Sequence, residues 1–159
     1  MEGKVIILMG SERDLEFSQE IAKTLRVLRM KFSFRIASAH KTPEKIMKIL
    51  KENENEKVVY ITVAGRSNAL SAFVDAATTR PVIACPPYSE KFGGVDIYSS
   101  LRVPSGIASL TTIEPEGAAL AAAKIFAIED NVLDKRVKKY QAENKMKIEK
   151  ADKTVKDLK

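Results

Sequence analysis

The chain lacks residues on which several classes of protein depend: it has no tryptophan, one cysteine and one histidine among 159 residues. One cysteine excludes a disulfide framework and a cysteine-rich zinc site within the chain, and one histidine excludes motifs such as HExxH. No apolar run approaches the ~20 residues of a membrane span. The apolar stretch near the N-terminus ends in a polar turn, without a signal-peptide cleavage pattern. We therefore expect a cytoplasmic protein without a membrane partner or a metal site.

The composition is that of a globular protein, with 45% hydrophobic and 30% charged residues, which excludes wholesale disorder. The length fits one domain of ~100–150 residues with a modest tail. The net charge is +6, and residues 130–159 alone hold ten basic and six acidic side chains in an interleaved order. Interleaved charges are typical of a solvated helix face, so we do not expect binding to nucleic acid.

Apolar residues follow two alternating periods along the chain, one typical of strands and one typical of helices. Short β-branched runs predict buried strands at residues 4–10, 32–38, 58–65, 81–87 and 108–113. Helical spacing predicts helices over residues 17–28, from Pro43 into the polar run 51–57, over 68–77 and over 115–128. Such alternation indicates a parallel sheet covered on both faces. The predicted fold is α/β: a three-layer αβα sandwich with a flavodoxin-like, doubly wound parallel sheet and a C-terminal helix.

The end of the chain differs in kind from the rest. We expect residues 1–130 to form the α/β domain and residues 131–159 to form a C-terminal helical extension. Its apolar residues are too sparse to stabilise an isolated helix, so it should pack on its own domain or on a neighbouring subunit. The alternative for the last ten residues is a frayed basic tail.

Ligands of open parallel sheets bind beyond the carboxyl ends of the strands, so the segments that follow each strand are the candidates for a site. In the first, Gly10 and Ser11 precede a helix N-terminus and suit a phosphate, and Asp14 suits ribose hydroxyls. The segment is neither a Walker motif nor GxGxxG. The alternative is that Ser11 and Asp14 only cap the first helix.

The second segment holds the lone His40, between Ser38 and Lys41 at the start of a helix. Imidazole exchanges protons near neutral pH, so a phosphate grip beside a proton-transfer group is the functional interpretation, and a plain surface histidine is the alternative. In the third segment Gly65 and Ser67 suit an oxyanion or a carboxylate, whereas Ser67 or Asn68 could equally be a helix cap.

Three further features are less specific. Cys85 lies in a buried-strand pattern and is expected to be an inert core residue. Pro86-Pro87 indicates a rigid turn, and the peptide bond before a proline can be cis. Arg102 lies in a later loop, where it would bind a ligand or form a salt bridge between subunits.

Six motifs follow one another between Val5 and Ala127: GSxxD, SAHK, VAGRSN, PVIxCPP, SSLRxPSG and PEGxAxxAAxIF. Together they resemble the phosphoribosylaminoimidazole carboxylase family of purine biosynthesis. The class I pattern reads SAHR, followed by an AGxAAHLPG loop with a second histidine. Here Lys41 replaces that arginine and GRSNAL replaces that loop, so the chain is more similar to class II, including the carboxylase domain of the bifunctional animal enzyme. Arg13 stands where the family often has serine, and we expect no effect on the site.

The resemblance implies a carbon–carbon lyase that reversibly carboxylates 5-aminoimidazole ribonucleotide with free CO2. It implies that Ser11, Ser38 and Lys41 hold the 5′-phosphate, that Asp14 holds the ribose hydroxyls, and that Gly65 and Ser67 lie at the aminoimidazole and CO2 end. His40 would be the general acid and base, without any cofactor.

The resemblance also implies partners: the ribonucleotide, CO2 and seven further copies of the chain in a homo-octamer. Two alternatives stay open. One is the class I reaction, in which a mutase moves a carboxylate from the ring-bearing amine to carbon 4. The other is a non-catalytic flavodoxin-like module that binds a nucleotide or a flavin phosphate.

Overall fold

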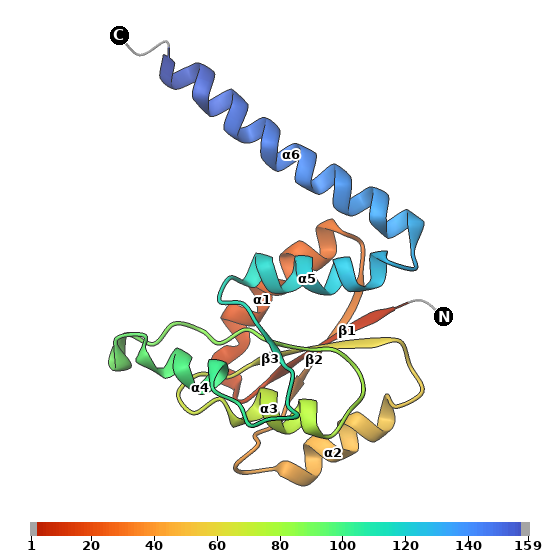
Figure 1. Ribbon diagram of the computed structural model, residues 1–159, viewed down its shortest axis with the longest axis vertical. Helices are drawn as coiled ribbons and strands as arrows, with labels where there is room; N and C mark the ends of the chain where they lie inside the picture. The colour runs from red at the N-terminus through yellow and green to blue at the C-terminus, as the bar shows by residue number, and fades with distance from the viewer. Residues whose placement is uncertain (1–2, 157–159) are drawn as a thin grey trace.

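The apolar runs of the sequence form a five-stranded parallel sheet in the computed structural model, which describes residues 3–156 (Figure 1). The strands lie in the order β2-β1-β3-β4-β5. This is the flavodoxin-like order, with a switch point between β1 and β3, so the predicted fold class is confirmed. The strands are β1 (Lys4–Met9), β2 (Lys31–Ile36), β3 (Val58–Val63), β4 (Val82–Ala84) and β5 (Leu110–Thr111).

Helices cover both faces of the sheet because the central strands are apolar on both sides. On β1, Val5, Ile7 and Met9 pack in one core with α1 (Leu15–Val27) and α5 (Pro115–Ala127). The alternate residues Ile6 and Leu8 pack in a second core with α2 (Pro43–Glu52) and α3 (Ala69–Ala76). Side chains alternate across a strand, and all six residues of β3 are buried, so the sheet is the middle layer of the sandwich.

The register of the strands brings three loops to one level. Met9, the last residue of β1, is paired with Ile36 at the end of β2 and with Val63 at the end of β3. The chain therefore leaves these three parallel strands at the same edge of the sheet. The segments that the sequence singled out after each strand meet there.

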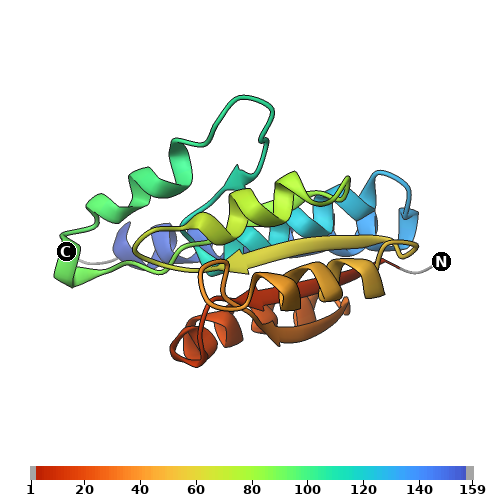
Figure 2. The same cartoon turned by 90° about the horizontal axis from the view of Figure 1, so that it is seen from below.

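Two strands are shorter than the sequence predicts. The run 81–87 contributes only β4, since Pro86 and Pro87 have no N–H to continue a ladder. The run 108–113 contributes only the two residues of β5, at the edge of the sheet. Between them, residues for which the sequence predicted no helix form three short helical turns, and Figure 2 shows this green segment projecting from the sandwich. They are η2 (Glu90–Phe92), η3 (Val95–Ile97) and α4 (Tyr98–Leu101).

The C-terminal extension is one helix, α6 (Asn131–Lys156), which leaves the sandwich after its first turns (Figure 1). Leu133 and Val137 pack against the ends of α1 and α5, and Tyr140 donates a hydrogen bond of 2.7 Å to Glu116 on α5. The helix includes residues 150–156, and residues 157–159 lie outside the described part of the chain. No helix within residues 3–156 is long and apolar enough to cross a membrane.

Candidate active site

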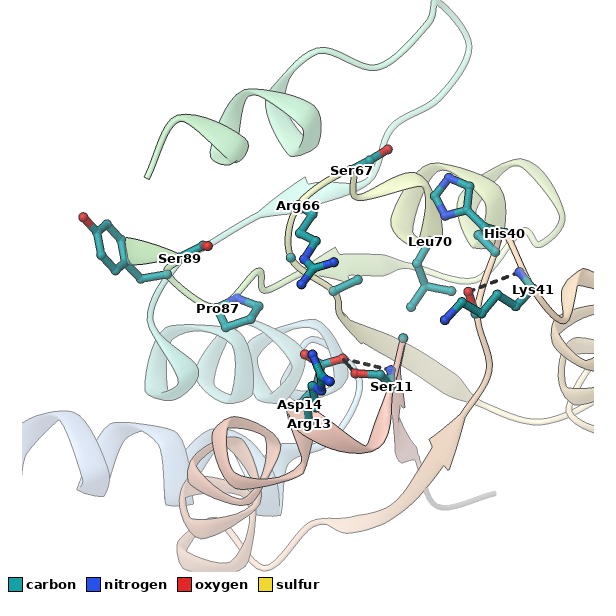
Figure 3. A pocket seen from close by; sticks show the side chains of 16 residues that line it. Ser11, Arg13, Asp14, His40, Lys41, Arg66, Ser67, Leu70, Pro87 and Ser89 are labelled. Atoms are coloured by element: carbon teal, nitrogen blue, oxygen red, sulfur yellow. Dashed lines mark hydrogen bonds between the residues drawn. The ribbon is translucent and has the colours of Figure 1, made fainter. Parts of the chain in front are cut away.

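A cleft of about 680 Å³ lies at the carboxyl ends of β1, β2, β3 and β4, across the switch point of the sheet (Figure 3). A Cβ at Gly10 would lie 3.3 Å from the Cβ of Ala64, so glycine allows the first and third turns to approach closely. All seven residues that the sequence proposes for the site line this cleft. The lining consists of Gly10, Ser11, Arg13, Asp14, Ser38, Ala39, His40, Lys41, Ala64, Gly65, Arg66, Ser67, Leu70, Pro87, Tyr88 and Ser89.

The turn after β1 is closed by its own side chains. One carboxylate oxygen of Asp14, Oδ2, accepts hydrogen bonds from the N–H of Ser11 at 2.9 Å and from its hydroxyl at 3.1 Å. These bonds enclose the 3₁₀ turn η1 (Glu12–Asp14) and place Asp14 at the N-cap of α1. Burial raises the pKa of the Asp14 carboxyl, and the two bonds from Ser11 oppose that rise. This pair therefore forms a capping box around η1, while the Asp14 side chain makes no cap bond to α1, and Oδ1 of Asp14 is left for a ligand.

The turn after β2 is also closed locally. The N–H of Ser38 donates to Oγ1 of Thr42 at 2.9 Å, and the N–H of Lys41 donates to Oγ of Ser38 at 3.3 Å. Thr42 is the N-cap of α2, which starts at Pro43, where the sequence predicts the start of a helix. Between them His40 is exposed and has no hydrogen bond to any residue from 3 to 156. Its ring and the Lys41 side chain extend from the same turn (Figure 3).

The turn after β3 ends in a side-chain cap and contains one residue with a left-handed backbone. Asn68 is the N-cap of α3 and its side chain accepts from the N–H of Ser71 at 3.3 Å, which decides between the two caps that the sequence allowed. Gly65 and Ser67 precede it in the cleft wall. Between them Arg66 has a φ of +62°. This is the left-handed region of the backbone, which residues other than glycine, asparagine and aspartate rarely adopt.

The charges of the cleft favour an anion. Arg13, Lys41 and Arg66 line it, and Asp14 is the one acidic residue in the lining. Within residues 3–156 none of these three cationic side chains forms an ion pair with a carboxylate. The helices α1, α2 and α3 begin next to the lining, so their positive N-terminal ends add to the potential. We expected Arg13, which stands where the family often has serine, to have no effect on the site. It is instead one of the residues that line the cleft.

The remaining candidates lie elsewhere. Cys85 is fully buried in the core, and burial raises the pKa of its thiol to about 12, as expected of an inert residue. The Pro86-Pro87 bond is trans, since no described peptide bond is cis. Arg102 does not line the cleft. Within residues 3–156 no three histidine, cysteine or acidic side chains gather as metal ligands.

Fold and site together define a flavodoxin-like sandwich with a cationic cleft at its switch point, which has the charge to suit an anionic ligand beside one solvent-accessible imidazole. The sequence model of the family described as AIR carboxylase matches residues 4–147. The chain belongs to the AIR carboxylase family.

The chain is also similar to individual proteins whose names match this family. The phosphoribosylaminoimidazole carboxylase of Archaeoglobus fulgidus is 56% identical over 94% of this chain and 83% of its own length. The multifunctional protein ADE2 of Gallus gallus is 36% identical over 98% of this chain and 37% of its own length. The crystal structure of Treponema denticola PurE superimposes with a TM-score of 0.95 at 47% identity, and the match covers 98% of this chain and 99% of that one.

Proposed function

We propose that the protein carboxylates carbon 4 of 5-aminoimidazole ribonucleotide with free CO2, the class II reaction of its family. The observation that supports this most is the combination in one cleft of a cationic phosphate grip with His40 as the single imidazole. A class I site would need a second histidine in the turn after β3, and the chain has no other histidine. That turn reads Gly65-Arg66-Ser67-Asn68 instead.

The ribonucleotide would span the three turns. Its phosphate would lie against Ser11, Ser38 and Lys41, where hydroxyls, a cation and two helix N-termini converge. Its ribose hydroxyls would donate to Oδ1 of Asp14, since Oδ2 is engaged by Ser11. The aminoimidazole would then extend toward Gly65 and Ser67, in reach of His40. Binding by the phosphate orients the base for reaction.

The chemistry needs few residues. The exocyclic amine pushes electron density onto carbon 4, and carbon 4 attacks CO2, so a carbon–carbon bond forms while one C=O π pair moves onto oxygen. The product of this step carries both a proton and a carboxylate on carbon 4. His40 takes that proton, and the electrons of the C–H bond restore the aromatic ring. Backbone N–H groups of the third turn and the Ser67 hydroxyl would stabilise the new carboxylate.

An assay of substrate choice tests the proposal. The purified protein is given one of two substrates: 5-aminoimidazole ribonucleotide together with CO2, or the N5-carboxylated ribonucleotide alone. The C4-carboxylated product is measured in both cases. We expect product from the ribonucleotide and CO2, faster when the reaction starts with dissolved CO2 than with bicarbonate, and carbonic anhydrase should abolish that difference. Turnover of the N5-carboxylated isomer alone would establish the mutase, and tight flavin binding without either reaction would establish the non-catalytic module.

Assembly is a second part of this proposal. Large apolar side chains are exposed on the projecting segment, among them Val95, Tyr98 and Leu101, and on the distal half of α6, among them Met146 and Ile148. A homo-octamer would bury such surface, and α6 would then pack on a neighbouring subunit beyond its own base. Light scattering of the purified protein checks this, since a monomer or dimer at micromolar concentration would contradict it.

A further inference from the structure

The turn after β3 carries a backbone strain that its own residues do not relieve. Arg66 has a φ of +62°, although arginine gains nothing from the left-handed region and lacks the short polar side chain that helps asparagine or aspartate there. Its guanidinium extends into the cleft toward Ser11 and Asp14 (Figure 3). The conformation of this one residue therefore decides what the middle wall of the cleft presents.

Asp96 and Ser99 hold both peptide groups of Arg66. The N–H of Arg66 donates to Oδ2 of Asp96 at 2.8 Å. Oγ of Ser99 lies 2.8 Å from the carbonyl oxygen of Arg66 and 2.7 Å from that of Asp96, and these two oxygens share its one proton. The same hydroxyl accepts the N–H of Asn68 at 2.9 Å.

Asp96, Ser99 and Ser100 belong to the projecting segment. The resemblance to the family assigns none of the three a role in the site. Asp96 lies in η3, and Ser99 and Ser100 lie in α4. Asn68 anchors them, because its side-chain N–H donates to Oγ of Ser100 at 2.8 Å and both residues are only 2% exposed. The bonds span about thirty residues of sequence, so the turn is shaped by a distant part of the chain.

We propose that Asp96 is a positioning residue of the active site, which keeps Arg66 in its left-handed conformation and so directs the Arg66 guanidinium and Ser67 into the cleft. The inference rests on the proposed function, because the turn it shapes is the one assigned to the aminoimidazole and CO2. Asp96 itself does not line that cleft. It acts through the N–H of Arg66, so it should affect the phosphate end only through the Arg66 guanidinium, since Ser11, Ser38 and Lys41 lie on the other two turns.

The test compares Asp96→Ala, which removes the acceptor, with Asp96→Asn, whose side-chain oxygen still accepts the same N–H. Misplacement of a site wall without loss of the fold commonly costs about tenfold or more in turnover. We expect kcat for carboxylation to fall by that factor in Asp96→Ala and to stay within about threefold of the unmodified protein in Asp96→Asn and in the exposed control Glu90→Ala. The affinity for ribose 5-phosphate should change less than kcat in Asp96→Ala, because Ser11, Ser38 and Lys41 stay in place, and should be unchanged in the other two variants. An unchanged kcat in Asp96→Ala, or an equal loss in Asp96→Asn, overturns the proposal.

A second pair of variants isolates the backbone effect. Glycine adopts a positive φ without help, so in an Arg66→Gly background the further change Asp96→Ala should lower kcat by less than twofold. A full, additive loss in the double variant would show that Asp96 does not act through residue 66.

Amide hydrogen exchange separates this inference from the proposed reaction. The N–H of Arg66 should be protected in the unmodified protein and in Asp96→Asn, and should exchange faster in Asp96→Ala. If the unmodified protein does not carboxylate the ribonucleotide, the reaction fails while the exchange pattern still measures the positioning. If the Arg66 amide exchanges equally in all three proteins, the positioning fails whatever the reaction is.

Discussion

The three turns that wall the cleft are held in two different ways. The turns after β1 and β2 are closed by bonds between residues three or four apart, Asp14 to Ser11 and Thr42 to Ser38. The turn after β3 is held at Arg66 and Asn68 by the segment 96–100, about thirty residues later. The half of the cleft that suits a phosphate is thus locally self-contained, whereas the half assigned to chemistry depends on tertiary structure. Variants of the two halves should separate binding, catalysis and stability.

The largest effect is expected at His40. His40→Asn should lower kcat by about 10²–10⁴-fold, the usual contribution of general acid–base catalysis, because asparagine keeps the polarity of the site but cannot carry the proton. The exposed ring has no hydrogen bond to the described residues, so the thermal midpoint and the affinity for ribose 5-phosphate should not change. Turnover close to that of the unmodified protein would remove His40 from the chemistry.

The turn after β3 is held by contacts with segment 96–100, so loss of such a contact should lower the free energy of unfolding. Asn68→Ala removes the cap of α3 and leaves the buried Ser100 hydroxyl without its donor, and together these changes should lower the free energy of unfolding by about 2 kcal/mol. Urea denaturation measures this, with the exposed Asn55→Ala as the matched control. We expect kcat to fall as well, since the turn loses its anchor. A stability loss no larger than that of the control would mean that segment 96–100 does not hold this turn.

The locally closed half should instead respond in substrate affinity. Lys41→Ala removes one cation from the phosphate end, and KM for the ribonucleotide should rise about tenfold, which corresponds to the lower end of the ~1.5–3 kcal/mol of a charge-assisted contact because Lys41 is exposed. The value of kcat should change little, and high salt should narrow the difference between the two proteins. Lys48→Ala, exposed on the following helix α2, is the control. An unchanged KM would exclude Lys41 from the phosphate site.

The same division explains how far the sequence predicts the molecule. The apolar runs of β1 and β3 and the polar residues that follow them predict the sheet, its order of layers and the position of the cleft, because these depend on neighbours in the chain. Ser11, Asp14, Ser38, His40 and Lys41 all lie in turns whose bonds are local.

What the sequence does not predict depends on distant contacts. A left-handed arginine has no composition signal, and nothing in the order of residues links Asp96 to Arg66. The short turns of segment 90–101 have no apolar period, so the sequence predicted no helix there. Arg13 and Tyr88 lie within the segments that follow strands, so the same rule that located the cleft would have included them in its lining.

The smallest effect, and the one that tests the local half most closely, is the pH dependence of stability at Asp14. Burial raises the pKa of this carboxyl above its ordinary value of 3.8 despite two hydrogen bonds from Ser11. The folded protein therefore binds this proton more tightly than the unfolded chain. The stability that results is complete below the ordinary pKa and is lost as the pH rises through the raised one.

Asp14→Asn does not titrate, and its side-chain oxygen still accepts the N–H of Ser11. Its free energy of unfolding relative to the unmodified protein should therefore increase as the pH rises from below 3.8 toward neutrality. The exposed Glu12→Gln in the same turn is the matched control. The affinity of Asp14→Asn for the ribonucleotide should fall, because an amide is a weaker acceptor for ribose hydroxyls than a carboxylate. Chemical denaturation across this pH range measures the first effect and KM the second. A variant that loses stability relative to the unmodified protein as the pH rises would show that the bonds from Ser11 outweigh burial, and an unchanged KM would show that Asp14 does not bind the ribose hydroxyls.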